Sequence, residues 1–231
     1  MNLLKRAGTI TRPNPSALAL RQYFVSDLDL HRVVVSYDRP LVPGYAWIVP
    51  VGNRTFNVGC GVTLTGESNR ASGLKNKLTL FLDRFPLGRE LMRTGKPAGP
   101  VQGAPLRCGL SGLASAVHGR TVAVGEALGT TFPFTGEGIG KALHSGQLAA
   151  ECLDQALTRG SAATLSCLDA VLERELKPLY AGYSVAQRWL SRPWLNDFVA
   201  RRVRGSAYLR QQVNTFMAHT GDPRVLSLIH I

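Results

Sequence analysis

The sequence predicts an α+β fold: a mostly antiparallel sheet, then a strand, a long helix and further helices. Three observations predict it. Two runs rich in β-branched and aromatic residues flank the turn dipeptide Gly52-Asn53, which is typical of a β-hairpin. A short β-branched run at 121–124 leads through glycines into a segment of helical periodicity. Residues 163–218 also have a mostly helical pattern, broken by Pro178 and Pro193.

The first third of the chain supplies the strands. Residues 17–37 read as one or two strands separated by an acidic turn at 26–29. Residues 45–51 and 55–62 are the two arms of the predicted hairpin. This pattern favours a largely antiparallel sheet with one polar face.

A helix and a linker are expected next. Residues 67–85 place Leu74, Leu78, Phe81 and Leu82 on one side of a helix, and Pro86 is expected to end it. Glycine and proline are frequent from 95 to 105, which predicts an irregular linker back toward the strand at 121–124.

The strand at 121–124 is apolar and β-branched, as expected where both faces of a parallel sheet are covered. Gly125 and Gly129 after it allow a tight turn. The helix that follows is expected to begin near Gly136. Its apolar and small residues at steps of three and four predict one continuous buried face; they are Ile139, Leu143, Gly146, Ala150, Leu153 and Leu157.

The same helix carries four glycines at 136, 138, 140 and 146. Each glycine weakens a helix interior by up to about 1 kcal/mol relative to alanine. Their number suggests that a bulky partner lies against the first turns. A helix N-terminus without side chains presents N–H groups and a partial positive charge, which suits an anionic or electron-rich ligand.

The net charge of +12 concentrates late in the chain. Two interpretations stay open: a solvated helical face with its tryptophans packed inward, or a helix that lies on a membrane surface. Specific nucleic-acid binding is not expected, because no recognised binding motif is present. The residues concerned are Arg188, Arg192, Arg201, Arg202, Arg204 and Arg210, among Trp189, Trp194 and Phe198.

The cysteine count and the lack of targeting signals predict a cytoplasmic protein, with peripheral membrane contact as an open alternative. Four cysteines are scattered without a CxxC pair, so we expect thiols in a reducing compartment and no metal site. No apolar run approaches the length of a membrane span, which is about 20 residues. No signal-peptide pattern is found in the sequence.

Three motifs carry a resemblance to a known family. They are F-P-F-T-G-E-G-I at 132–139 after Gly125-Glu126, P-G-Y-A-W-I-V-P at 43–50 with F-N-V-G-C-G-V at 56–62, and R-Q-Y-F at 21–24. In this order, over most of residues 15–155, they resemble the geranylgeranyl reductase branch of the para-hydroxybenzoate-hydroxylase-like flavoproteins. The resemblance implies a substrate domain followed by the last strand and helix of a Rossmann-like FAD domain.

The resemblance also implies the chemistry. The cofactor would be FAD, reduced by NAD(P)H or a ferredoxin-type donor, and the substrate an isoprenoid or another hydrophobic small molecule whose C=C bond is reduced. It singles out no catalytic side chain. A prenyl chain would lie against Tyr45, Trp47 and Pro50. The residues implied to contact FAD are Gly125, Glu126, Pro133, Gly136, Glu137, Gly138 and Ile139.

The sequence departs from the family pattern in several places. Glu126 stands where the family has aspartate, Val49 stands where it often has phenylalanine, and no Gly-x-Gly-x-x-Gly follows an N-terminal strand. The chain is therefore interpreted as a fragment that binds FAD poorly alone. Residues 226–231 can be back-translated to CTG TCT CTT ATA CAC ATC, a string that matches a sequencing-library transposon end, so this tail is interpreted as non-native; an ordinary apolar tail is the alternative.

These expectations divide the chain into a substrate-binding sheet domain with one helix at 1–105, the C-terminal part of the FAD-binding domain at 106–160, a helical region at 161–225 and the tail at 226–231. Two other functions stay open. One is a flavin monooxygenase or halogenase of the same fold. The other is a non-catalytic remnant that binds lipid or a partner, which the missing dinucleotide fingerprint favours.

Overall fold

The computed structural model describes residues 15–64, 73–111, 115–160 and 165–217, together with residues 4, 6, 8 and 10. The interpretation of the tail at 226–231 therefore lies outside the described residues. The chain divides into two compact units. Unit 1 comprises Met1–Pro15, Leu106–Trp189 and Asp197–Ile231, and unit 2 comprises Ser16–Pro105 and Leu190–Asn196.

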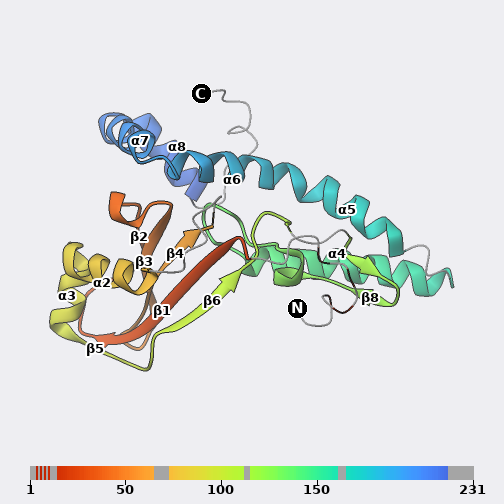
Figure 1. Cartoon of the computed structure of the whole chain (residues 1–231), viewed down its shortest axis with the longest axis horizontal. Helices are drawn as coiled ribbons and strands as arrows, with labels where there is room; N and C mark the ends of the chain where they lie inside the picture. Colours follow the sequence, from red (N-terminus) through yellow and green to blue (C-terminus); the bar gives the residue numbers. More distant parts are fainter. Residues whose placement is uncertain are drawn as a thin grey trace. The chain divides into compact units, whose positions relative to one another are not determined.

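Unit 2 is built on an antiparallel sheet in which neighbouring strands follow the order β2-β3-β4-β1-β5, and β6 also pairs with β1 (Figure 1). The predicted hairpin is confirmed, with Asn53 and Arg54 at positive φ in its turn. The segment 95–105, which was expected to be an irregular linker, instead contributes two strands, β5 and β6, that pair with β1. The strands are β1 (Ala17–Ser26), β2 (Val34–Ser36), β3 (Gly44–Gly52), β4 (Thr55–Thr63), β5 (Gly95–Pro97) and β6 (Gln102–Leu106).

One face of this sheet is covered by α2 (Leu74–Arg84) and α3 (Pro86–Thr94). The start of the helix predicted at 67–85 lies partly outside the described residues, and Pro86 both follows α2 and opens α3. The sheet supplies Phe24, Ile48 and Val58 to the core, and α2 supplies Leu78 and Phe81. Alternate positions of each strand enter this core, so the intervening positions share the opposite face.

Unit 1 contains the short strand pair β7 (Val117–His118) and β8 (Thr121–Val122). The prediction of a buried parallel strand at 121–124 is wrong in this structure. β8 has two residues, pairs antiparallel with β7, and leaves Val124 exposed, because the described residues offer it no parallel neighbour. The 3-10 turn η2 (Gly125–Leu128) and α4 (Ile139–Thr158) follow.

The buried face of α4 differs from the predicted one. Ile139 is 80% exposed, Leu143 73% and Leu157 81%. The buried residues are the small ones on another side of the helix: Ser145, Ala149, Cys152 and Ala156. They pack where α4 meets η2 and α5 (Cys167–Glu175). Small side chains let neighbouring backbones approach closely, whereas no described residue covers the larger apolar stripe.

A matched pair of Leu→Ala substitutions tests this assignment. We expect Leu157→Ala on the exposed stripe to change the free energy of unfolding by about 0.5 kcal/mol or less. Leu168→Ala on α5, where the side chain is 0% exposed, is expected to cost about 2–5 kcal/mol because it leaves a cavity. Urea unfolding of both variants measures the difference, and equal losses would contradict the assignment.

The C-terminal region is helical, as predicted, and comprises α5, α6 (Lys177–Leu190), α7 (Pro193–Gly205) and α8 (Ala207–Met217). Pro193 opens α7, and Pro178 lies in the first turn of α6. The interpretation in which the tryptophans pack inward is wrong for Trp194, which is exposed on α7 together with Phe198. In the part of the chain that is described, no helix combines the length and apolarity needed to cross a bilayer.

Candidate functional site

Glu126 organises the turn that follows β8. One carboxylate oxygen, Oε1, accepts a hydrogen bond from the backbone N–H of Arg107 at 2.5 Å, and Oε2 accepts one from Oγ1 of Thr131 at 2.9 Å. The residue itself is exposed. A carboxylate has about four lone-pair sites, so Glu126 can hold this turn and still accept a hydrogen bond from a ligand.

Gly125 lets the turn lie close to α4. It adopts φ +59, and a Cβ at this position would lie 3.2 Å from Cβ of Ala142. Its N–H donates to Oγ of the fully buried Ser145 at 2.9 Å. Glycine at 125 is therefore explained by the positive φ and by the close approach of the helix.

The loop from Pro133 to Ile139 leads into α4. Pro133 is half-buried, Gly136 is exposed with φ +68, and the side chain of Ile139 is exposed to solvent. The side chain of Glu137 lies against the first turn of α4, where its Oε1 accepts a hydrogen bond from the N–H of Gly140 at 2.7 Å. This contact supports the interpretation that Glu137 caps the helix.

Two of the four glycines in this region have explanations within the chain. Gly136 is at positive φ, and a Cβ on Gly138 would lie 2.7 Å from Oγ1 of Thr131. Gly146 faces open space, so no described residue requires glycine there. The suggestion that all four glycines serve one bulky partner is therefore too broad.

The first N–H groups of α4 remain available. Glu137 takes the N–H of Gly140, whereas no described residue accepts the N–H of Gly138 or Ile139. The first N–H groups of an α-helix have no partner within the helix. They carry the positive end of its dipole, so this end of α4 can accept an anionic or carbonyl-bearing group.

An aromatic cluster lies beneath the loop. The ring of Phe132 stacks on Tyr183, with centroids 4.0 Å apart, and is tilted against Tyr180 at 4.9 Å. The hydroxyl of Tyr180 donates to the carbonyl of Thr130. Burial, with a smaller contribution from the negative charge of Glu137, raises the pKa of Tyr183 to about 12. These tyrosines therefore stay protonated at neutral pH and act as packing groups and hydrogen-bond donors.

Tyr45 and Trp47 lie together in unit 2, on the face of the sheet opposite α2 and α3. Their ring centroids are 5.8 Å apart. Nε1 of Trp47 donates to Oδ1 of Asn57 at 3.0 Å, which fixes the orientation of the indole. Pro50 lies in register with Phe56, a core residue, so the structure does not bring Pro50 together with the two aromatic residues.

The indole of Trp47 lies over a strand position without a side chain. Trp47 pairs in register with Gly59, and a Cβ on Gly59 would collide with the indole and with the carbonyl oxygen of Leu20. Arg21, on the other side of Gly59, is a residue of this face that sequence reasoning did not assign to a site. The signal that could have found it is the alternation along β1, which places Arg21 and Tyr23 opposite the core residues Leu20 and Phe24.

Cys60 is excluded as a nucleophile. It is buried, and its Sγ contacts the carbonyl oxygen of Leu74 at 3.4 Å. Burial raises the pKa of its thiol to about 12, although the charge of Lys77 opposes this shift. The reactive form of cysteine is the thiolate, which is scarcely populated here at neutral pH. Among the described residues, no group of acidic, histidine or cysteine side chains could hold a metal ion.

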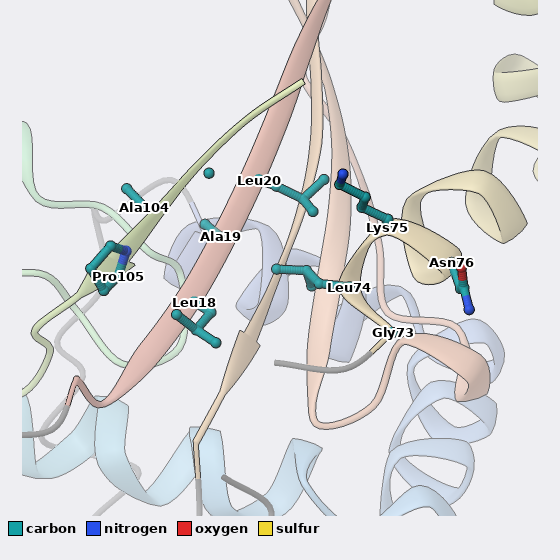
Figure 2. A pocket seen from close by; sticks show the side chains of 10 residues that line it. Leu18, Ala19, Leu20, Gly73, Leu74, Lys75, Asn76, Ala104 and Pro105 are labelled. Carbon is teal, nitrogen blue, oxygen red and sulfur yellow. The ribbon is translucent and has the colours of Figure 1, made fainter. Parts of the chain in front are cut away.

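Unit 2 also has an open cleft of about 580 Å³ at the N-terminus of α2 (Figure 2). It is bordered by Leu18, Leu20 and Leu74, and by Ala104 and Pro105 of β6. Leu18 and Leu20 belong to the alternation of β1 that faces the core. The lining is mostly apolar, with Lys75 as its charged residue, so it lacks the convergent polar groups of a catalytic pocket.

Comparisons with curated proteins identify the family. The chain is 34% identical over 153 residues to digeranylgeranylglycerophospholipid reductase of Methanosphaerula palustris, covering 64% of this chain and 36% of that protein. It is 31% identical over 160 residues to the protein of that name from Methanoculleus marisnigri, covering 68% and 38%. The chain belongs to the geranylgeranyl reductase family of flavoproteins. It spans less than two fifths of the length of these two relatives.

The relatives differ in the substrate that their names give. Menaquinone reductase of Mycobacterium tuberculosis is 36% identical over 129 residues, which are 55% of this chain and 30% of that protein. The chain matches no family model.

Solved structures agree on the fold. A geranylgeranyl bacteriochlorophyll reductase-like protein of Thermoplasma acidophilum has a TM-score of 0.65 at 23% identity, covering 79% of this chain and 45% of that one. The flavin-dependent brominase Bmp2 has a TM-score of 0.67 at 14% identity, covering 93% and 54%. These likenesses confirm the predicted α+β flavoprotein fold.

Proposed function

We propose that the chain is part of an FAD-dependent reductase that saturates isoprenoid C=C bonds. The observation that carries the proposal is the sequence similarity to two reductases of prenylated lipids, which reaches at least 30% identity. The brominase neighbour shares the fold at 14% identity, so it does not favour halogenation or oxygenation over reduction.

The residues of unit 1 fit a flavin. The N–H groups of Gly138 and Ile139 have no acceptor among the described residues, and Gly136 presents backbone without a side chain. They would hold the electron-rich carbonyl edge of the ring, since a helix N-terminus stabilises negative charge without a titratable group. Glu126 would accept hydrogen bonds from hydroxyls of the cofactor. FAD, when bound, would supply the hydride; NAD(P)H or a ferredoxin-type protein is proposed as the donor.

The aromatic face of unit 2 would bind the isoprenoid. Tyr45 and Trp47 are half-buried, so they offer a large apolar surface. Asn57 holds the indole in place, and Gly59 leaves room for it. In this proposal, the face binds and orients a prenyl chain and excludes water from it. Peripheral membrane contact stays a prediction, supported by exposed Trp194 and Phe198 on the arginine-rich α7; sedimentation with anionic vesicles would test it.

The test uses the complete reading frame that contains this chain. We expect the purified protein to retain FAD, and we expect its reduced form to add two hydrogens across each C=C bond that it reduces in a prenyl substrate, measured by mass spectrometry. A flavoprotein that leaves the prenyl chain unchanged under anaerobic reducing conditions, but oxygenates or halogenates an aromatic substrate once O2 (and halide) is supplied, would contradict the proposal.

A substitution at Glu126 tests the cofactor role. We expect Glu126→Ala to weaken FAD binding by about 10-fold or more, because hydrogen bonds to a charged group are worth about 1.5–3 kcal/mol. The measurement is the FAD content after gel filtration, together with FAD titration. Glu151→Ala is the matched control, since this exposed carboxylate lies further along α4, where it accepts a hydrogen bond from Gln147, and its loss should leave FAD affinity nearly unchanged. Equal FAD affinity in Glu126→Ala and the unmodified protein would remove Glu126 from the site.

A further inference from the structure

Two of the four cysteines meet where α4 packs on α5 (Figure 1). Cys152 lies on the buried face of α4, and Cys167 is the first residue of α5. The thiol of Cys167 donates to Sγ of Cys152, and the two sulfur atoms are 3.3 Å apart. The sequence did not predict this pair, because the two cysteines belong to different helices and form no CxxC motif.

This contact brings the sulfur atoms close to bonding distance. The S–S distance of a disulfide is about 2.0 Å, so the sulfur atoms need to approach by roughly 1.3 Å. Both residues belong to unit 1, so the approach requires no movement between the two units. Cys60, by contrast, lies in the core of unit 2, where its Sγ contacts the carbonyl oxygen of Leu74.

The two thiols differ in their access to solvent. Cys152 is buried, whereas Cys167 is half-buried. Burial, the contact with Cys167 and the negative charge of Glu151 all raise the pKa of the Cys152 thiol. The reactive form of cysteine is the thiolate, so Cys152 is a poor first nucleophile at neutral pH. An oxidant from solvent therefore reaches Cys167 first, and Cys152 is placed to react with the product.

We propose that Cys152 and Cys167 are a reversible redox site, at which hydrogen peroxide converts the two thiols into a disulfide that fastens α4 to α5. The Cys167 sulfur attacks one peroxide oxygen, the O–O bond breaks, and a sulfenic acid and water form. The Cys152 sulfur then attacks the Cys167 sulfur. The S–O bond breaks, the S–S bond forms, and a second water leaves. The thiols lose two electrons and two protons, which reduce one peroxide to two waters.

The reverse reaction needs a thiol reductant. A dithiol attacks the disulfide by thiol–disulfide exchange, restores both cysteine thiols and becomes a disulfide itself. The half-buried Cys167 gives the reductant access to one of the two sulfur atoms. The state of the pair therefore follows the balance between peroxide and dithiol around the protein.

The disulfide acts on the helix that supports the turn after β8. Oγ of Ser145 on α4 accepts the N–H of Gly125 in that turn. A cross-link between α4 and α5 restricts the unfolded chain and thereby stabilises the folded one. The oxidised chain therefore resists unfolding of α4 and α5 more strongly than the reduced chain. The inference does not rest on the proposed function, since neither thiol is assigned to FAD or to the prenyl chain.

The experiment treats the reduced 231-residue chain with hydrogen peroxide, isolates the monomer by gel filtration and blocks remaining thiols with iodoacetamide. Peptides are then mapped by mass spectrometry without reductant. We expect a linked pair of peptides that contains Cys152 and Cys167 and lacks two hydrogens, and we expect dithiothreitol to restore both thiols. Cys152→Ala and Cys167→Ala should each abolish the linked pair. Cys60→Ala is the control and should leave it unchanged, because Cys60 lies in unit 2.

Thermal unfolding in both redox states gives a second readout, which a packing contact alone would not change. We expect the Tm of the oxidised chain to exceed that of the reduced chain by about 5–10 °C, and the difference to vanish in Cys167→Ala. Oxidation of Cys167 to a sulfinic acid, or its linkage to a second chain, with Cys152 still a free thiol would overturn the proposal. A linked pair without any rise in Tm would overturn the fastening of α4 to α5.

Discussion

Gly59→Ala is expected to destabilise unit 2 by about 3 kcal/mol or more, at the upper end of the usual cost of overpacking. The added methyl group would collide with two groups that cannot easily move. One is the carbonyl oxygen of Leu20 in the neighbouring strand, and the other is the indole of Trp47. The indole is held by its hydrogen bond to Asn57, so relief requires breaking that bond or spreading the strands. Urea unfolding, followed by far-UV circular dichroism, measures the loss.

Gly61→Ala is the matched control for Gly59→Ala. Gly61 lies two residues along β4, on the same face, and a Cβ there would make ordinary contacts at 3.6–3.8 Å. The added methyl group also restricts the unfolded chain, which typically stabilises a protein by about 0.4–1 kcal/mol. We therefore expect Gly61→Ala to be neutral or slightly stabilising. If both variants lost the same free energy, the clash at Gly59 would not be the cause.

Phe132→Ala is expected to cost unit 1 about 3–5 kcal/mol, the usual range for a buried Phe→Ala change. Phe132 is nearly inaccessible and packs on Tyr180 and Tyr183. Its backbone also closes the loop, because its N–H donates to the carbonyl of Glu137 and its carbonyl accepts the N–H of Gly136. Removal of the ring therefore loosens the loop that the proposed function assigns to FAD.

Hydrogen exchange with mass spectrometry is the measurement for Phe132→Ala, because it reports on each unit separately. We expect faster exchange in peptides covering 125–145, and unchanged exchange in the strands of unit 2. Ile139→Ala is the control, since its side chain is mostly exposed although it lies in the same loop region. Unchanged protection of the loop in Phe132→Ala would show that the aromatic cluster does not support it.

The hairpin of unit 2 could be predicted because its signals are local. Gly52 and Asn53 adopt the positive φ that a tight turn requires, and alternation on both sides determines the register. The strands β5 and β6 could not be predicted in the same way. Their sequences, G-K-P and Q-G-A-P-L, have low strand propensity, and they form strands because β1 offers them its free edge. A neighbour distant in the sequence decides such cases.

The face of α4 illustrates a different limit of sequence reasoning. Periodicity identifies an apolar stripe, but it does not say what the stripe contacts. Ala149 and Cys152 are buried because small side chains allow η2 and α5 to approach, while Leu143 and Leu157 remain exposed. α4 has small or apolar residues on two sides, and both sides have helical periodicity. The sequence alone therefore could not show which of the two sides is buried.

From the sequence, residues of the candidate site could be predicted only where a family motif includes them. The motif implied Glu126 and Gly136–Ile139, but their cofactor role stays a prediction. It did not show that both oxygens of Glu126 already accept hydrogen bonds within the chain. The place of Arg21 beside Trp47 could not be predicted, because it depends on pairing with Gly59, and through it with Trp47, more than 20 residues along the chain. Such a relation appears only once the strands are paired.

The division into units has a consequence for biosynthesis. Nearly all of unit 2 comes from one uninterrupted stretch, Ser16–Pro105, whereas unit 1 needs Leu106–Trp189 and later residues. A ribosome adds about 5–20 residues per second, and domains generally fold in order of emergence. The sheet of unit 2 can therefore form its core several seconds before most of unit 1 has been synthesised. Leu190–Asn196 then joins unit 2 last, so a nascent chain released before that point would carry a nearly complete sheet without its final segment.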